Sequence, residues 1–368
     1  MSAPASPAMR AGFEVTGLEL DTAGSARATR RLQEALVAGG EVELVAISQP
    51  RAPRALSGRL VRGLARELTW FPLRLPLRAR RLGLDVLHCP MPLAPTRPSV
   101  PLVLTVNDVL AWEHPEWFGR ALVAQHRLVV APAARRAARV LAPSGYSAQR
   151  VTAVLGVDPA RVDVAPYAPD PIFSPGPRRD EVLARLGVEG RYALAVGTLQ
   201  PRKNLETTLD AFERLAVAGA EQRLVVVGAR GWRDERLAAR LERSPTGGRV
   251  VAAGHVADAD LVELYRAADC LAFCSRGEGF GFPVLEAMAC GTPVVCSSTT
   301  SLGEVAGDAA ELADPDDVAD VERALGAVLG SASRRAQLRR RGLDRVRAFS
   351  WERCAQLTAA AYRRAAGA

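Results

Sequence analysis

Short apolar runs alternate with amphipathic segments along the chain, most clearly after residue 190. The runs in this second half are apolar throughout, as expected of parallel strands that are buried on both faces. They are YALAVG (192–197), RLVVVG (223–228), RVVAAG (249–254), CLAFCS (270–275) and TPVVCS (292–297). Between the first two lies NLETTLDAFERLA (204–216), in which Leu205, Leu209 and Phe212 share one helical face. This alternation predicts a doubly wound α/β domain.

The first half repeats the pattern more faintly, with a first strand-like run just after Met9. Further candidate strands are EVELVAIS (41–48), DVLHCP (85–90), PLVLTVND (101–108), RVLAPS (139–144) and VDVAPY (162–167). The proline-rich stretch 168–180 is typical of an interdomain linker. We therefore predict two Rossmann-like, doubly wound parallel-sheet domains, residues 1–169 and 170–368. Ligands of such sheets bind beyond the carboxyl ends of the strands, so a cleft between the domains is the expected site.

The composition fits two soluble globular domains in 368 residues, with 48% hydrophobic and 24% charged residues. No run approaches the ~18 apolar residues that a membrane-spanning helix needs. The first residues lack the basic-then-apolar pattern of a secretory signal. Six cysteines without metal-ligand spacing are expected to be reduced and buried. Together these features predict a cytoplasmic protein.

The net charge of +8 is concentrated in one segment. Residues 51–81 carry nine arginines against a single acid, Glu67, and mix them with leucines, Trp70 and Phe71. This pattern suits an interfacial helix on anionic lipid, at the inner face of the cell membrane. It suits equally an amphipathic helix whose apolar side packs into the N-terminal domain. Nucleic acid is not a favoured partner.

The only lysine, Lys203, stands beside 47 arginines in the chain, within the segment GTLQPRKN (197–204). This segment follows a predicted strand and opens a predicted helix, for which Asn204 is the expected N-cap. A helix N-terminus disfavours cations, so Arg202 and Lys203 make sense there if an anion such as a diphosphate binds. The alternative is a solvated basic turn, and we favour anion binding.

A second motif, EGFGFPVLEAMACGTPVV (278–295), follows the run CLAFCS. Pro283 suits the first turn of a helix that a later glycine ends. Gly279 and Gly281 let the backbone approach a ligand closely. We expect the backbone N–H groups near Phe282 to be free to meet phosphate oxygens.

Two carboxylates of this motif, Glu278 and Glu286, would repel a diphosphate. They fit better as hydrogen-bond acceptors for hydroxyl groups on either side of the phosphates. A nucleotide sugar has this layout, with a hydroxylated ring at each end of a diphosphate. The structural alternative is that Glu286 caps its helix and Glu278 is solvated.

These motifs resemble the retaining glycosyltransferases of family 4, which have the GT-B fold. The resemblance covers most of the chain from about residue 85 onward. Besides the two motifs above, the matching segments are HCPMPLAP (88–95), TVNDVLAWEHPEWF (105–118), SGYSAQRV (144–151), GHVADADLVELYRAADC (254–270) and EVAGDAAELADP (304–315). It implies two Rossmann-like domains facing a central cleft, with a last helix, around 350–366, that packs back on the N-terminal domain.

By this resemblance, Arg202 and Lys203 bind the donor diphosphate and stabilise it as it leaves. Glu278 would hold hydroxyls of the donor sugar, and Glu286 the nucleotide ribose. The other donor-binding positions implied are Gly197, Gly279, Phe280, Gly281, Phe282, Pro283 and, as the weakest match, Gly24 in the turn after the first strand. The family needs no metal, so neither a metal nor another cofactor is expected.

The chain departs from the family at Asn107–Asp108, where a His-Asp pair is common. Asn107 can hydrogen-bond a sugar hydroxyl but cannot become a cation. We keep Asn107 as a catalytic-site candidate, while His114 is expected to be structural.

The chain lacks the motifs of two other classes of nucleotide-binding protein. No G-x-G-x-x-G, as in a dehydrogenase, follows a strand, and Lys203 is followed by Asn204 and not by the Ser or Thr of a P-loop ATPase. We predict a metal-independent, retaining transfer of a hexose, with mannose as our guess, for polysaccharide biosynthesis. The donor would be a GDP- or UDP-linked sugar bound by the C-terminal domain, and the acceptor a glycan or polyprenyl-linked glycan bound by the N-terminal one. Two alternatives remain, a sugar-nucleotide epimerase of the same fold and a catalytically weak nucleotide-sugar-binding partner subunit.

Overall fold

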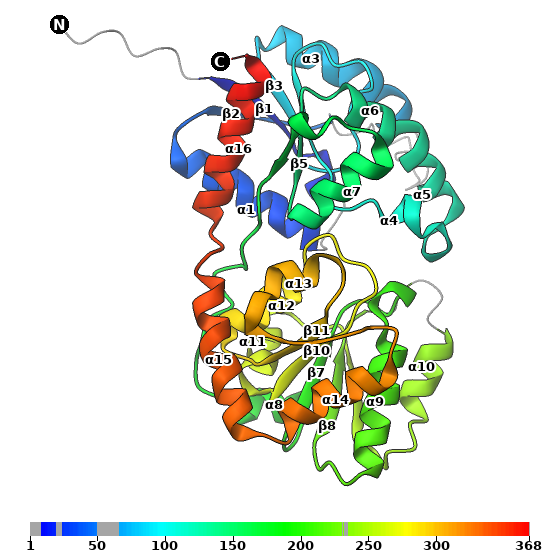
Figure 1. The fold of residues 1–368 in the computed structure, drawn as a ribbon. Helices are drawn as coiled ribbons and strands as arrows, with labels where there is room; N and C mark the ends of the chain where they lie inside the picture. The colour runs from blue at the N-terminus through cyan, green and yellow to red at the C-terminus, as the bar shows by residue number, and fades with distance from the viewer. Residues whose placement is uncertain (1–8, 20–23, 50–65, 230, 232–234, 368) are drawn as a thin grey trace, which may run out of the picture. The chain divides into compact units, whose positions relative to one another are not determined.

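The computed structural model describes residues 9–19, 24–49, 66–229, 231 and 235–367. The chain divides into two compact units (Figure 1). The N-terminal unit comprises Met1–Tyr167 and Ser350–Ala368, and the C-terminal unit comprises Ala168–Phe349. The chain therefore leaves the N-terminal unit once and returns to it for its last helix.

The described residues of the N-terminal unit form a six-stranded, all-parallel sheet of order β2-β1-β3-β4-β5-β6. Its strands are β1 (Arg10–Glu14), β2 (Glu43–Ile47), β3 (Val86–Cys89), β4 (Leu102–Thr105), β5 (Arg139–Ala142) and β6 (Val162–Val164). Its α-helices are α1 (Gly24–Gly39), α3 (Leu75–Arg81), α4 (Leu110–Glu113), α5 (Arg120–Gln125), α6 (Ala131–Arg136), α7 (Gly145–Leu155) and α16 (Trp351–Ala366). The strands β3 and β4 are buried along their whole length, and apart from His88 and Thr105 their residues are apolar.

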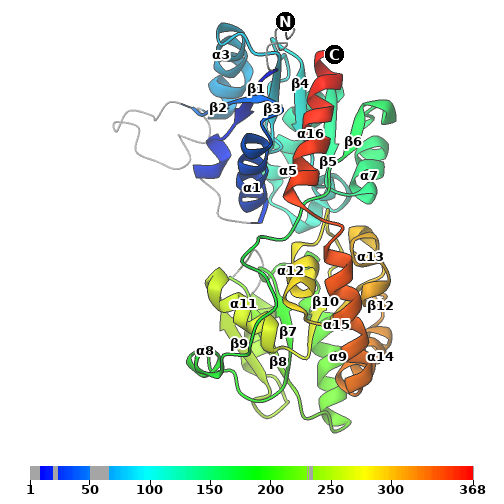
Figure 2. The ribbon, with the colours of Figure 1, turned by 90° about the vertical axis from the view of Figure 1, so that its left-hand side faces the viewer.

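The last helix, α16, lies beside α1 and packs on the sheet (Figures 1 and 2). A buried polar contact fixes it there, because His88 Nδ1 of β3 lies 2.7 Å from the Tyr362 hydroxyl. The other ring nitrogen, His88 Nε2, lies 2.8 Å from Thr105 Oγ1. Burial lowers the pKa of His88 to about 3, so this imidazole is neutral in the folded protein.

The C-terminal unit has a second six-stranded parallel sheet in its described part, of order β12-β11-β10-β7-β8-β9. The strands are β7 (Tyr192–Val196), β8 (Arg223–Val227), β9 (Val250–Gly254), β10 (Cys270–Phe273), β11 (Val294–Ser297) and β12 (Glu311–Ala313). Its α-helices are α8 (Asp180–Arg185), α9 (Leu205–Val217), α10 (Glu235–Glu242), α11 (Asp258–Ala267), α12 (Phe282–Cys290), α13 (Thr300–Ala306), α14 (Val318–Leu329) and α15 (Ala332–Val346). The strand order reverses between β7 and β10, the arrangement of a Rossmann fold.

Arginines of α15 hold the ends of the helices around it. Arg335 donates to the last two carbonyl groups of α14, at 2.8 and 2.7 Å. Arg339 donates to Gly291 O, just after α12, and Arg345 to two carbonyls near the end of α13. These carbonyls lack partners within their own helices, and cations are favoured at helix C-termini. The arginines thereby satisfy groups that burial would otherwise leave unpaired.

Both predicted α/β domains are confirmed as parallel, doubly wound sheets, and each predicted strand run contains a strand. The short strand β12 was not predicted. No helix in the described part of the chain is both long and apolar enough to cross a bilayer. All six cysteines are buried and free, as predicted.

The arginine-rich segment 51–81 is described from Arg66 onward, and residues 51–65 lie outside the described part. A π-helical segment, Arg66–Arg74, leads into α3. The side chains of Trp70 and Phe71 are buried in the core of the unit, and Trp70 Nε1 donates to Glu14 Oε1 at 3.1 Å. These two aromatic rings are therefore core residues, as the packing alternative predicted for the apolar side of this segment.

Candidate functional site

The two sequence motifs meet at the point where the strand order of the C-terminal sheet reverses. Strands β7 and β10 are neighbours, and the chain turns from β7 towards β8 but from β10 towards β11. The 3-10 turn Pro201–Lys203 follows β7, and Glu278 follows β10. Loops that diverge in this way leave a crevice at the carboxyl ends of the strands, the usual ligand site of open parallel sheets.

Three charged side chains meet there. Lys203 Nζ lies 2.6 Å from Glu278 Oε1, and Arg202 Nη1 lies 3.3 Å from the same oxygen. The side chains of Lys203 and Glu278 are only 11% and 10% exposed. The ammonium group also lies 4.7 Å from the centre of the Phe273 ring, within range of a cation–π interaction. Lys203 and Glu278 are 75 residues apart in the sequence, yet their side chains are in contact. We call Arg202, Lys203 and Glu278 the charged cluster.

Burial and charge act in opposite directions on the pKa values of this cluster. Burial lowers the pKa of Lys203, and the facing Glu278 carboxylate offsets part of that effect. Burial would raise the pKa of Glu278, but the charges of Lys203 and Arg202 outweigh it, so its pKa lies below the ordinary value. Glu278 is therefore a carboxylate at neutral pH and can act only as a hydrogen-bond acceptor.

A serine that the sequence reading did not single out orients the carboxylate. Ser275 Oγ lies 2.8 Å from Glu278 Oε1 and 2.8 Å from the carbonyl oxygen of Arg202. Ser297 Oγ in turn donates to Ser275 O at 2.6 Å. Ser275 comes directly after the β10 region and three residues before Glu278, which is the only signal in the sequence that could have indicated its role.

Asn204 anchors the cationic turn, but not as the helix cap that the sequence predicts. Its backbone is left-handed (φ 53°), and its side chain makes no capping hydrogen bond to α9. Its side-chain nitrogen donates instead to Cys274 O (3.0 Å) and Pro315 O (2.6 Å), while Thr207 donates to its side-chain oxygen. The prediction failed because two distant carbonyls compete for this side chain. Their effect is to tie the turn of Lys203 to the end of β10.

Gly197, at the end of β7, leaves room for the lysine. Its φ of 146° disfavours other residues, and a Cβ atom there would lie 3.3 Å from Cδ and Cε of Lys203. The aliphatic part of Lys203 therefore packs against the Gly197 backbone. This contact directs the ammonium group towards Glu278.

The glycine-rich loop after Glu278 is close-packed at Gly281. This residue has φ 111°, and a Cβ atom there would meet Leu302 Cδ2 at 2.4 Å. Ser301 Oγ lies 2.9 Å from Glu278 O and 3.0 Å from Phe280 O, which holds the loop from the side of α13. Gly279 lies within the same loop, between these two contacts. A side chain at Gly281 would force the loop away from its support.

Helix α12 begins at Phe282 with Pro283 in its first turn and ends at a left-handed Gly291, as predicted. The prediction of free amides around Phe282 is wrong for the nearby Val284, because Val284 N donates to Gly281 O at 3.1 Å. The first turn of this helix therefore satisfies part of its own backbone.

Glu286 lies within α12 and is buried, so it does not cap the helix. The Tyr265 hydroxyl donates to Glu286 Oε2 at 3.1 Å, and the Tyr265 ring packs edge-on against Phe173. The charge of Glu286 helps to raise the pKa of Lys203, so the two groups lie within electrostatic reach. Tyr265 is a second partner that the sequence reading missed, since it comes from another helix, α11.

The remaining candidates belong to the N-terminal unit. Asn107 follows β4, where its side-chain oxygen accepts a hydrogen bond from the Tyr167 hydroxyl at 2.7 Å. Burial raises the pKa of Tyr167, so this phenol stays protonated and donates. Gly24 is the first residue of α1, and residues 21–23 of its predicted turn lie outside the described part. His114, expected to be structural, has a side chain that is 42% exposed.

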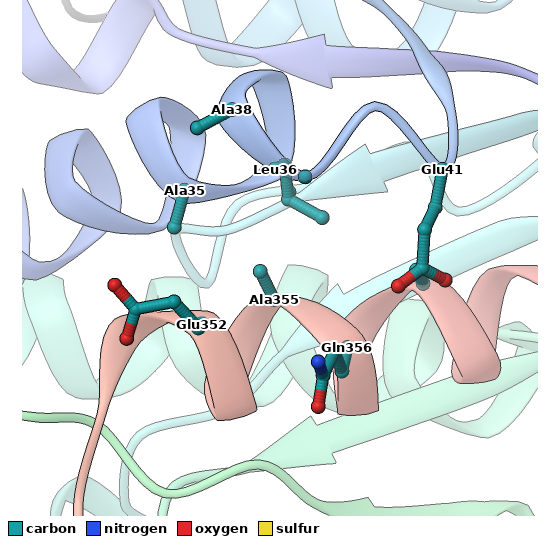
Figure 3. A pocket seen from close by; sticks show the side chains of 9 residues that line it. Ala35, Leu36, Ala38, Glu41, Glu352, Ala355 and Gln356 are labelled. Carbon is teal, nitrogen blue, oxygen red and sulfur yellow. The ribbon is translucent and has the colours of Figure 1, made fainter.

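No group of three or more His, Cys, Asp or Glu side chains among the described residues is placed to hold a metal ion. A groove of about 250 Å³ runs between α1 and α16 (Figure 3). It is lined mainly by small residues, among them Ala35, Ala38 and Ala355. No predicted site residue lines this groove.

Two family models match consecutive parts of the chain. The model described as Glycosyltransferase Family 4 matches residues 22–171, and the model described as Glycosyl transferases group 1 matches residues 183–345. The O-antigen chain mannosyltransferase B of Escherichia coli is 43% identical over 173 residues, which is 47% of this chain and 45% of that protein. Across eight curated relatives that it matches, the chain covers between 20% and 64% of the relative's length.

Solved structures share the fold at low sequence identity. Sucrose-phosphate synthase from Thermosynechococcus elongatus superposes with a TM-score of 0.74 at 19% identity, over 96% of this chain and 98% of that one. Anabaena HepE in complex with UDP and glucose gives a TM-score of 0.70 at 18% identity, with the same coverage. The predicted GT-B fold and the resemblance to family 4 are confirmed by these matches. The names of the relatives do not favour the epimerase or the non-catalytic subunit.

Proposed function

We propose that this chain, which belongs to the group 1 glycosyl transferases of family 4, transfers a hexose from a nucleotide-diphosphate sugar to a glycan acceptor. The observation that carries the proposal is the charged cluster at the reversal of strand order, with Lys203 Nζ 2.6 Å from Glu278. Among the relatives, the O-antigen chain mannosyltransferase B and the serotype-specific mannosyltransferase WbdA lead us to propose mannose as the sugar.

The two cations of the cluster suit a diphosphate leaving group. When the bond between sugar and phosphate breaks, negative charge grows on the phosphate oxygen. Arg202 and Lys203 are fixed beside that position and largely shielded from water, so they stabilise this charge without reorganising. Removal of one such preorganised donor typically costs about 10²–10³ in rate. On this view the chain's own cations supply the stabilisation, and we propose that transfer needs no metal.

The two carboxylates suit the neutral ends of the donor. We propose that Glu278 accepts hydrogen bonds from hydroxyls of the donor sugar and that Glu286 accepts them from the ribose. Both are buried, which strengthens such bonds relative to water. Glu278 also shares its Oε1 with Lys203, so diphosphate and carboxylate attract the same ammonium group.

We further propose that the donor binds the C-terminal unit and the acceptor the N-terminal unit, with retention of anomeric configuration. Asn107 would then contact a sugar hydroxyl as a neutral group, because its side-chain oxygen already receives the Tyr167 hydroxyl. Its side-chain NH₂ group has donors to offer such a hydroxyl.

A thermal-shift screen of GDP-mannose, UDP-glucose and ADP-glucose, each with and without EDTA, tests the donor. We expect one nucleotide sugar to raise the melting temperature of the protein, with the same shift in EDTA. Transfer to α-linked mannobiose, followed by NMR of the new anomeric proton, tests retention. The proposal fails if no nucleotide sugar shifts the transition, or if the donor is consumed without transfer to any acceptor.

We also propose that the protein rests on the anionic, cytoplasmic face of a membrane. Trp70 and Phe71 are buried, whereas Leu73 and Leu77, in the described part of the segment, are 60% and 56% exposed. They lie one helical turn apart among the exposed arginines Arg74, Arg78, Arg80 and Arg81. Apolar side chains set among arginines suit an anionic bilayer surface.

Co-sedimentation with vesicles tests this contact. We expect binding to vesicles that contain phosphatidylglycerol, little binding to pure phosphatidylcholine, and loss of binding in the double variant Leu73→Glu, Leu77→Glu. Equal binding of the double variant would contradict the proposal.

A further inference from the structure

Aromatic side chains are concentrated in the segment Trp112–Phe118, WEHPEWF. Three of its seven residues are Trp or Phe, in a chain whose aromatic content is 5%. All three are only partly buried, as is His114 between them. The 3-10 turn Pro115–Trp117 contains no fully buried residue. The segment thus carries four rings that the core of the unit does not fully cover.

Two of these rings form a flat stack. The His114 and Trp117 rings have centroids 3.9 Å apart and planes inclined by only 12°. His114 comes directly before the 3-10 turn and Trp117 is the last residue of that turn, so the turn brings the two rings together. Trp112 packs edge-on against His126 beside it, with centroids 5.2 Å apart.

Paired charges border the stack. Arg150 Nε of α7 lies 2.7 Å from Glu113 Oε1, and both side chains remain partly exposed. His114 Nδ1 lies 3.2 Å from Glu116 Oε1. The border therefore offers both hydrogen-bond donors and hydrogen-bond acceptors.

The segment lies at the edge of the sheet where ligands of this fold bind. It follows Asn107 and Asp108 directly, beyond the carboxyl end of β4. Helix α7 joins the same edge, because Ser147 Oγ donates to Asn107 O at 2.9 Å. Arg150 is one helical turn after Ser147, so α7 brings its guanidinium group to the segment.

We propose that Trp112, Glu113, His114, Trp117 and Arg150, here named the aromatic cluster, form a subsite for a pyranose ring of the acceptor glycan. This inference rests on the proposed function and extends it to the recognition of the acceptor. A pyranose has an apolar face of C–H groups, which packs on a flat aromatic surface, and a rim of hydroxyls, which needs both donors and acceptors. The cluster supplies a stack of this kind and a rim of paired charges.

A carbohydrate fits the cluster better than a lipid surface does. Glu113 and Glu116 both border the rings, and an anionic bilayer would repel them. The exposed leucines and arginines of 73–81 lie on a different segment, so they already provide a separate candidate surface for lipid. The two surfaces can therefore be tested independently.

The test compares Trp117→Ala and Trp117→Phe with the intact protein, using α-linked mannobiose as the acceptor probe. In Trp117→Ala we expect a rise of about tenfold in the KM for mannobiose, with unchanged KM for the donor. Trp117→Phe keeps a flat ring and should recover most of the affinity. Leu128→Ala, at an exposed apolar position outside the cluster, is the matched control.

A second measurement needs no turnover. Mannobiose should change the tryptophan fluorescence of the intact protein, and this change should be lost in Trp117→Ala. The subsite is wrong if the intact protein gives no such change, or if Trp117→Ala alters donor and acceptor KM alike. It is also wrong if that variant loses only vesicle binding. The proposed function fails separately, by the absence of any nucleotide-sugar binding in the intact protein.

Discussion

The two sheets are both parallel and six-stranded in their described parts, but their carboxyl edges differ in the kind of polar group they present. In the C-terminal unit the edge carries the charged cluster, with an ion pair that is almost fully buried. In the N-terminal unit Asn107 follows β4 and is held by a protonated tyrosine, and the neighbouring aromatic cluster adds two stacked rings. On our proposals, the first edge would hold an anion and the second a neutral, hydroxylated molecule.

The difference also explains how each edge is stabilised. Removing charges from water costs several kcal/mol per ion, so a buried ion pair needs further hydrogen bonds. Ser275 supplies one to Glu278, and Asn204 ties the turn of Lys203 to the end of β10. At the N-terminal edge the ion pair of Arg150 and Glu113 is more exposed to solvent, at 37% and 19%, so its charges lose less hydration.

The largest expected effect comes from Lys203→Ala. We expect transfer to fall by about 10³, because a preorganised cation beside the leaving group is lost. The fold should persist, since Arg202 and Ser275 still contact Glu278. Steady-state kinetics with circular dichroism measures both. Lys203→Arg keeps the charge but brings a planar group into the space beside Gly197, so we expect an intermediate rate. If Lys203→Ala turned over as fast as the intact protein, the proposal that the C-terminal edge holds a diphosphate would be wrong.

A smaller effect is expected from Glu278→Gln. Transfer should fall by about 10², because the amide is a weaker acceptor for the sugar hydroxyls. Affinity for the nucleoside diphosphate alone should stay equal or rise, since the amide no longer competes for Lys203. Isothermal calorimetry with GDP and UDP measures this. Glu263→Gln, another buried carboxylate of the unit, paired with Arg266, is the control. A parallel loss of diphosphate affinity would show that Glu278 mainly supports the cations.

The smallest effect concerns the pH dependence of the N-terminal unit. His88 is buried and neutral, and burial lowers its pKa from an ordinary 6.5 to about 3. Its contribution to stability is therefore complete above pH 6.5 and is lost as the pH falls towards 3. Between pH 7.5 and 5.5 the loss amounts to about 1.4 kcal/mol. Urea unfolding of the intact protein and of His88→Gln at both pH values measures the difference.

A second observation covers the case in which His88→Gln does not fold. By NMR, the His88 ring of the intact protein should not titrate between pH 7.5 and 5.5. A ring that titrates in that range would rule out the buried neutral imidazole.

The sequence was most informative where a feature depends on a local pattern. Unbroken apolar runs predicted the strands because parallel strands are buried on both faces. Lys203 and Glu278 could be paired in advance because both follow strands of one sheet. Such reasoning uses only the order of residues and the topology that it implies.

The sequence was least informative about which groups meet across the fold. Asn204 looks like a helix cap, yet its side chain binds carbonyls 70 and 111 residues away. Trp70 sits in an arginine-rich segment, but its indole N–H finds the buried Glu14. Tyr265 reaches Glu286 from a separate helix. In each case the tertiary packing determines the hydrogen-bond partner, and the sequence of one segment does not indicate it.

The scarcity of lysine has a practical consequence. The helix ends around α15 are held by guanidinium groups, which do not react with amine-directed reagents under ordinary conditions. Lys203 is the only lysine in the sequence, so apart from the α-amino group the single primary amine is the one that contacts Glu278. Mild acylation followed by mass spectrometry would therefore measure how far a bound ligand protects Lys203 from the reagent, with no engineered tag and no signal from other lysines.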